Sequence, residues 1–223
     1  MRRMRARGLL PVAVLLVVVW LVLLPNIFVL ADSVRGGGGL TLDHYRRFWE
    51  SSAERDALWA SLWISAASVA LSALIGVPLA FLFARRDFPG RRLLGALAAM
   101  PVLLPPLVGT ISFMFLYGES GLFTRGVQAL LGLAQAPWRL SGPLAVLLVH
   151  GYTMYVYFYL FTAAGLSRLD AGYAEASAAL GADRWTTLRR VTLPMLGAAL
   201  GGAALLVFMT SMGSFSAPYA AGE

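Results

Sequence analysis

Residues 175–194, "EASAALGADRWTTLRRVTLP", form a polar segment that separates two long apolar runs at about residues 143–166 and 193–217. The segment holds two acidic residues, three arginines, one glycine and a closing Leu-Pro pair. Apolar runs of this length predict helices that cross a lipid bilayer, because roughly 20 mostly apolar residues span its hydrocarbon core. The sequence therefore predicts an organised polar loop between two membrane-spanning helices.

The whole chain has the composition of a membrane protein. Hydrophobic residues make up 59% of its 223 positions and charged residues 13%, whereas soluble domains are about half apolar and a quarter charged. Lipid offers no partner to backbone amides, so each spanning segment must be helical. The predicted fold is an all-α polytopic membrane helical bundle with five spans, at about residues 9–31, 58–84, 93–117, 143–166 and 193–217.

Arginine clusters predict the orientation of the chain. Twelve of the 18 basic residues lie before the first span, in the connection at 85–92, or in the loop at 167–192. Because positively charged loops stay on the cytoplasmic side, we expect both the N-terminus and the loop at 167–192 to be cytoplasmic. The net charge of +7 comes from such clusters beside apolar runs, which indicates membrane topology and not nucleic-acid binding.

Residues that carry chemistry are few. The chain has no cysteine, and its two histidines, His44 and His150, lie on separate predicted elements. We therefore expect neither a metal site nor a catalytic residue. The chain also has no lysine and no G-x-x-x-x-G-K-[ST] phosphate-binding loop, so ATP is not expected to bind to it.

The loop at 167–192 has the signals of two short helices. Asp170 can cap an alanine-rich first helix, and Gly181 supplies the permissive backbone that ends it. Asp183 can cap a second helix that runs through Arg190. Pro194 then bends the chain where the fifth span starts. Helices this short are unstable alone in water, so we expect them to pack against another surface, that of a partner protein.

The spacing within this loop resembles a known signature. Glu175-Ala176-Ser177 is followed by three residues, then Gly181, then nine residues, then Val191-Thr192-Leu193-Pro194. This is similar to the EAA signature of the inner-membrane permease subunits of binding-protein-dependent ABC importers, which reads Glu-Ala-Ala, three residues, Gly, nine residues, Ile-x-Leu-Pro. Ser177 in place of alanine and Val191 in place of isoleucine are the two departures.

The resemblance implies one transmembrane permease domain over residues 1–223, with the fold of a type I ABC importer, in the bacterial inner membrane. It implies a second permease unit, identical, different or fused, and an extracytoplasmic solute-binding protein. ATP and Mg would bind a partner ATP-binding cassette subunit, and this chain would bind no cofactor. The loop would dock on that ATPase through Tyr173, Glu175, Ala176, Ser177, Leu180, Gly181, Leu193 and Pro194.

Two further stretches narrow the branch of this family. "LPPLVGTISFMFLYGESGLFTRG" and "SMGSFSAPYAAG" resemble the importers of ferric iron, polyamine, thiamine and phosphonate. These are the substrates that the resemblance implies, ahead of sulfate or a sugar. Members of the family carry another span after the "SAPY" region, so we expect this chain to lack its sixth span.

Polar residues within the last two spans are candidates for the solute pathway. Tyr152, Tyr155 and Tyr159 share one face of a predicted helix, and His150 lies beside them. Ser214 and Ser216 lie near the outer end of the fifth span. Polar groups in a membrane face either a wet cavity or a partner helix, so both interpretations stay open.

The alternative function is a secondary transporter or channel subunit that needs no ATPase. Ion-coupled transporters usually carry ionisable groups within their spans. The five predicted spans contain no acidic residue and no arginine, which disfavours this alternative. A purely structural membrane scaffold would leave the spacing of the loop unexplained.

Overall fold

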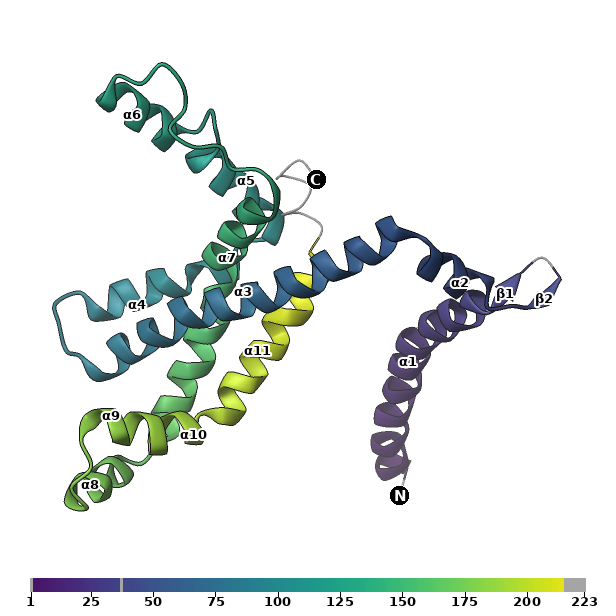
Figure 1. The fold of residues 1–223 in the computed structure, drawn as a ribbon. Coiled ribbons are helices and arrows are strands. Elements are labelled where there is room, and N and C mark those ends of the chain that lie inside the picture. Colours follow the sequence, from purple (N-terminus) through teal and green to yellow (C-terminus); the bar gives the residue numbers. More distant parts are fainter. Residues whose placement is uncertain (1, 37, 215–223) are drawn as a thin grey trace. The chain divides into compact units, whose positions relative to one another are not determined.

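The computed structural model describes residues 2–36 and 38–214 (Figure 1). The chain forms two compact units, residues 1–59 and 60–223, and the boundary between them falls within one long helix. Within the described residues, three helices are long and apolar enough to cross a membrane, and two bent helix pairs raise the total to five if each pair is one span. The predicted all-α, polytopic membrane architecture is confirmed.

The first unit contains the N-terminal span. Helix α1 (Arg2–Ser33) includes the predicted span at 9–31 and is followed by a two-stranded antiparallel hairpin, β1 (Arg35–Gly36) and β2 (Gly39–Leu40). Its side chains from residue 12 to residue 30 are all exposed in the isolated chain. Because these side chains are almost entirely apolar, the helix is suited to a lipid environment or to another apolar helix.

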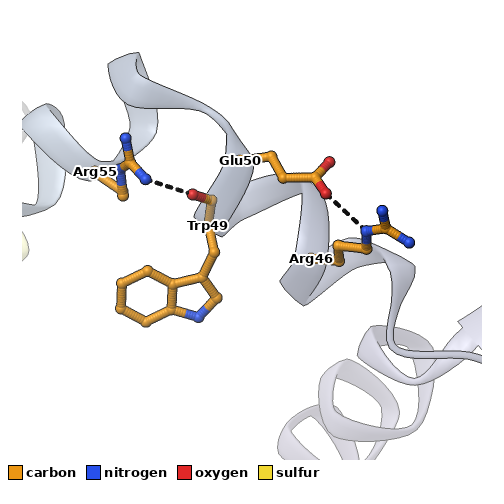
Figure 2. Close-up of polar contacts among 4 residues, drawn as sticks. All are labelled: Arg46, Trp49, Glu50 and Arg55. Carbon is orange, nitrogen blue, oxygen red and sulfur yellow. Dashed lines mark hydrogen bonds and ion pairs between the residues drawn. The ribbon is translucent and has the colours of Figure 1, made fainter.

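Helix α2 (Asp43–Glu50) is tied to both of its neighbours in sequence. The Tyr45 hydroxyl lies 2.9 Å from the Ser33 hydroxyl at the end of α1. Figure 2 shows the other junction, where Arg55 donates a hydrogen bond of 2.7 Å to the Trp49 carbonyl. Arg46 and Glu50 form an exposed ion pair one turn apart on α2. The hydrogen bond from Arg55 satisfies one of the carbonyls left free at the end of α2.

The second unit is built on α7 and α11, which run side by side, and on α3, which crosses them (Figure 1). The loop helices α8 and α9 lie at one end of this bundle, and α5 and α6 lie at the other. In chain order the elements are α3 (Ser52–Arg85), α4 (Arg91–Ala99), the 3-10 helix η1 (Met100–Leu103), α5 (Pro106–Tyr117), α6 (Leu122–Leu131), α7 (Gly142–Arg168), α8 (Ala171–Ala179), α9 (Arg184–Thr187), the π-helix η2 (Leu188–Thr192), α10 (Leu193–Met195) and α11 (Gly197–Met212).

A stripe of small residues lets α3 approach α7 closely. Five buried residues of α3, spaced by three or four positions, form the stripe: Ser65, Ser68, Ser72, Gly76 and Ala80. A Cβ added at Gly76 would lie 2.7 Å from the Phe158 Cβ and 2.8 Å from the Tyr159 backbone nitrogen. Helices in membranes associate through such small residues, because lipid provides no hydrophobic drive between apolar helices. Gly76 therefore marks the point of backbone contact between α3 and α7.

The expected helix over residues 93–117 is broken in the middle. The axis of Arg91–Leu103, which holds α4 and η1, and the axis of Leu107–Leu131, which holds α5 and α6, differ by 113°. Leu104 and Pro105, at the break, both have extended backbone angles. Each precedes a proline, Pro105 and Pro106, and a residue before proline is driven out of the helical region. The prolines also lack the N–H groups that would continue the helical ladder.

The fifth predicted span, 193–217, is also divided. The helix that ends at Met195 meets α11 at an angle of 65°, so the straight part starts at Gly197 and not at Leu193. The bend follows Pro194 by two residues, close to where the sequence predicts it. Residues 215–217 of the predicted span lie outside the described residues.

Replacing Gly76 with alanine is expected to destabilise the bundle, because the new methyl group overlaps the backbone of α7. Overpacking costs about 1–3 kcal/mol, which exceeds the gain of about 1 kcal/mol from alanine in a helix. Gly76→Ala should therefore lower the midpoint of thermal unfolding in detergent.

Gly201→Ala in α11 is the matched control, since nothing lies within 4 Å of a Cβ added at this helical glycine. If Gly76→Ala unfolds at the same temperature as Gly201→Ala, or above it, the proposed backbone contact between α3 and α7 is wrong.

Candidate functional site

The first half of the polar loop folds as its capping residues predict. The Asp170 carboxylate accepts a 2.9 Å hydrogen bond from the backbone N–H of Gly172 at the start of α8. Gly181 has a φ of +81°, a left-handed conformation that favours glycine. The N–H of Gly181 bonds to the carbonyl of Ala178, and that of Ala182 to the carbonyl of Ser177. These bonds satisfy carbonyls at the end of α8.

The second half starts as predicted and then changes its helix type. The Asp183 carboxylate accepts a 3.2 Å hydrogen bond from the N–H of Thr186. Hydrogen bonds from Thr186 hold the pKa of Asp183 below its ordinary value. An ordinary helix through Arg190 is not present, because α9 passes into the π-helix η2, where the Leu193 N–H bonds to the Leu188 carbonyl five residues back. The adjoining Pro194 cannot donate to Arg190, which removes one α-helical bond at this point.

A direct contact holds the two halves of the loop together. The Ser177 hydroxyl lies 2.9 Å from the hydroxyl of Thr187, which is itself buried. Ser177 is the residue that departs from the alanine of the EAA signature. Its hydroxyl therefore links α8 to α9, a contact that alanine could not make.

The outer surface of the loop is apolar and unprotected. Leu180 is 89% exposed, and Tyr173 and Trp185 are each more than half exposed. Glu175 and Ala176 are exposed as well, whereas Ser177 is only partly exposed. Of the two remaining predicted residues, Leu193 is half-buried and Pro194 is exposed. Large apolar side chains grouped on an exposed surface commonly mark a contact with another molecule.

A cavity of about 340 Å³ lies behind α8. Its wall includes Arg85 from the end of α3, Tyr173 and Glu175 from α8, and Thr192 from η2. The Arg85 guanidinium donates to the Thr192 hydroxyl over 3.4 Å. This hydrogen bond ties the end of α3 to η2, the segment that leads back into the membrane, whereas α8 stands away from the bundle.

The predicted pathway residue His150 is buried among hydroxyl groups of other helices. Its Nδ1 lies 2.9 Å from the Ser68 hydroxyl of α3 and 3.2 Å from the Ser211 hydroxyl of α11. Its Nε2 lies 3.2 Å from the Ser214 hydroxyl. His150 of α7 therefore connects three helices, which is the interhelical role that buried polar groups often play in membranes.

Two of the predicted tyrosines also have partners on another helix. The Tyr155 hydroxyl donates to the Ala98 carbonyl over 2.9 Å, and the Tyr159 hydroxyl donates to the Gly95 carbonyl over 3.2 Å. Both acceptors belong to α4. The two tyrosines thus join α7 to α4, and Tyr155 satisfies a carbonyl in the last turn of α4.

Tyr152 has a different environment from the other two tyrosines. Its ring lies 5.6 Å from that of Phe113, centroid to centroid, and it lines a cavity of about 120 Å³ beside the break between α4 and α5. Thr153 and Tyr157 line the same cavity but do not belong to the helix face that the predicted tyrosines share. Two prolines that also line it, Pro101 and Pro105, were the available signal. Ser216, the last predicted pathway residue, lies outside the described residues.

Residues 2–36 and 38–214 contain no group of three or more His, Asp or Glu side chains that could hold a metal ion. The polar loop and the helical bundle provide hydrogen-bonding groups and exposed apolar side chains.

The chain is similar to known permeases. Residues 76–223 match the model of the family described as "binding-protein-dependent transport system inner membrane component". The molybdenum transport system permease protein ModB of Mycobacterium tuberculosis is 33% identical over 174 residues, which cover 77% of this chain and 64% of ModB. The thiamine transport system permease protein ThiP of Brucella abortus is 29% identical over 212 residues, 92% of this chain and 37% of ThiP. The chain thus spans just under two thirds of one relative and little more than one third of the other.

The fold is similar to that of a solved importer. A crystal structure of a bacterial ABC transporter involved in the import of the acidic polysaccharide alginate superimposes with a TM-score of 0.64 at 14% identity, over 99% of this chain and 82% of that chain. At this identity the likeness concerns the fold alone. With the helical bundle and the family match, it identifies the class of protein. The chain belongs to the family of binding-protein-dependent inner-membrane transport components, the multi-pass membrane permeases of ABC importers, which are not themselves enzymes.

Proposed function

We propose that this permease forms half of a solute pathway and receives mechanical work from an ATP-hydrolysing subunit that docks on α8. The observation that carries the proposal is the exposed, alanine-rich α8 with its apolar side chains Tyr173 and Leu180, at one end of the bundle (Figure 1). A helix of nine residues is unstable alone in water. A groove on a partner would bury its apolar side chains and hold it in place.

The composition of α8 suits close docking. Five of its nine residues are alanine and one is glycine, so its backbone can approach a partner surface without steric obstruction. The exposed carboxylate of Glu175 would orient the helix through a charged hydrogen bond to the partner. Leu180 projects beyond the end of α8 and would fill an apolar pocket.

The loop is connected so that a displacement of α8 would reach the membrane. It is continuous with α7 on one side and with α11 on the other. The Ser177–Thr187 and Arg85–Thr192 contacts tie α8 to α9 and the loop to α3. A docked α8 would therefore move as one body with α9 and tilt the helices attached to it, a rigid-body switching mechanism. ATP and Mg would be bound and hydrolysed on the partner.

The same proposal includes the other partners and the orientation. A second permease unit, identical, different or fused, would complete the pathway, and an extracytoplasmic solute-binding protein would deliver the cargo. The clustered arginines support a cytoplasmic N-terminus and a cytoplasmic α8.

A small solute is the proposed cargo. Ferric iron, polyamine, thiamine and phosphonate are the substrates that the sequence implies, and relatives are named for molybdenum and thiamine transport. Thiamine is common to both sets. Phosphonate and molybdate, the oxyanion of molybdenum, are both anions with a tetrahedral central atom whose oxygens accept hydrogen bonds.

Gly181→Val is expected to uncouple transport from ATP hydrolysis. Valine is strongly disfavoured at a φ of +81°, so the turn between α8 and α9 must change shape. Because nothing lies within 4 Å of an added Cβ, the change should leave the membrane bundle intact. We expect solute uptake by proteoliposomes of the full importer to fall about tenfold or more, while the amount of inserted protein stays constant.

Gly90→Val is the matched control for this variant. Gly90 has a nearly identical φ of +80° and an open surrounding, but it lies in the connection before α4. Uptake by Gly90→Val should stay close to that of the unmodified chain. Normal uptake by Gly181→Val would contradict the coupling role of this turn.

Copurification tests the docking partner directly. The Glu175→Ala and Gly181→Val double variant should lose the ATPase that the unmodified permease retains on an affinity column. Asp87→Ala combined with Gly90→Val makes the same two kinds of change in another loop and should retain it. An ATPase held equally by both double variants would show that α8 is not its docking site.

A further inference from the structure

The break between α4 and α5 lies against a cavity inside the second unit. The lining of this cavity of about 120 Å³ includes Pro101, Val102, Leu104 and Pro105 at the break, and Tyr152, Thr153, Tyr157 and Thr210 from α7 and α11. Within a membrane, non-helical backbone is tolerated only where protein buries it or where it lines a water-filled space. A proline-broken segment beside a cavity therefore points to a place where water or solute enters the bundle.

Hydroxyl groups on α7 separate into two sets around this cavity. Tyr155 and Tyr159 donate to carbonyls of α4. Tyr152 and Tyr157 line the cavity, and their hydroxyls have no hydrogen-bond partner within residues 2–36 and 38–214. An unpaired hydroxyl is costly in an apolar environment. Tyr152 is 38% exposed and Tyr157 is partly exposed, so a molecule in the cavity that both residues line can reach them.

The hydroxyls of Tyr152 and Tyr157 lie too deep in the membrane to bind water at its surface. α7 has 27 residues, and at 1.5 Å per residue it is roughly 40 Å long. Tyr152 and Tyr157 lie on either side of its midpoint, hence within the hydrocarbon core, which is about 30 Å thick.

We infer that this cavity is a solute site of the permease and that it takes a small oxyanion. The inference rests on the proposed function, because it assigns a binding site to the proposed pathway. The two free tyrosine hydroxyls can donate hydrogen bonds, which the oxygens of an oxyanion accept. The five predicted spans supply neither a carboxylate that could balance a cation nor an arginine that could pair with an anion, so neutral hydroxyl donors would carry the recognition of the oxygens. Thr153 and Thr210 donate to backbone carbonyls of their own helices, so they shape the cavity and leave donation to the tyrosines.

Single cysteines test whether the cavity is wet, because the chain has no cysteine of its own. Thr153→Cys and Thr210→Cys, in the full chain reconstituted in proteoliposomes, should react with a charged methanethiosulfonate reagent. Ser120→Cys, at an exposed position, is the positive control. Thr162→Cys, fully buried in α7 and away from the cavity, should not react. Reaction at Ser120→Cys without reaction at Thr153→Cys and Thr210→Cys would overturn the inference.

Protection from labelling tests the class of ligand. Molybdate or sulfate at ten times its dissociation constant should slow labelling of Thr153→Cys about tenfold, whereas chloride and thiamine should not. Protection by thiamine alone would show that the site takes an organic cation, and no protection by any of these probes would show that the cavity binds none of them. Either result would overturn the oxyanion assignment.

Variants of the two cavity tyrosines are compared with variants of the two tyrosines that bind α4. Tyr152→Phe and Tyr157→Phe should each abolish protection by molybdate without loss of stability. Tyr155→Phe and Tyr159→Phe should keep protection and lower thermal stability, because they leave carbonyls of α4 unpaired. Labelling needs no ATPase, so Gly181→Val should leave labelling and protection unchanged. A failure of coupling and a failure of the solute site are thereby distinguishable.

Discussion

Backbone hydrogen bonding in lipid is the constraint on which this structure depends. An N–H or carbonyl without a partner is costly in hydrocarbon, so long stretches of α3 and α7 are uninterrupted helices. The chain departs from this pattern at prolines, between α4 and α5 and near Pro194. Each of these places has a feature that accommodates the lost helical hydrogen bonds. A cavity adjoins the first, and a π-helical turn lies at the second. The irregular segments are therefore the positions where function is most easily placed.

The bundle holds together without large apolar side chains at its closest contact. Gly76 brings α3 against the backbone of α7, and the hydroxyls of Ser68 and Ser211 both contact Nδ1 of His150. Helices joined by small residues and hydrogen bonds have a defined register, because each polar contact fixes a depth as well as a direction. This register also fixes which hydroxyls of α7 meet α4 and which meet the cavity.

The caps and the turn of the polar loop were predictable from the sequence. Which side chains of different helices form hydrogen bonds with one another was not. Asp170, Gly181 and Asp183 act as caps and as a turn because each depends on its own backbone and the next few residues. The break at Pro105 was missed because an apolar run of 25 residues was taken as one helix, although its prolines were visible. Tyr152, Tyr155 and Tyr159 share a predicted face, yet only the packing of α4 decides which of their hydroxyls are paired.

The proposed coupling loop and the proposed solute site share their helices. Tyr152 and Tyr157 belong to α7, and Thr210 belongs to α11, the two helices that the loop joins. A tilt that enters through α8 would thus reach α7 directly and α11 through α9, η2 and α10, and would change the separation of the cavity walls. Both segments that flank the proline break would follow α7, because Tyr155 and Tyr159 bind carbonyls of α4 and Phe113 of α5 packs against Tyr152. The cavity would then open between α7, together with the segments that it carries, and α11.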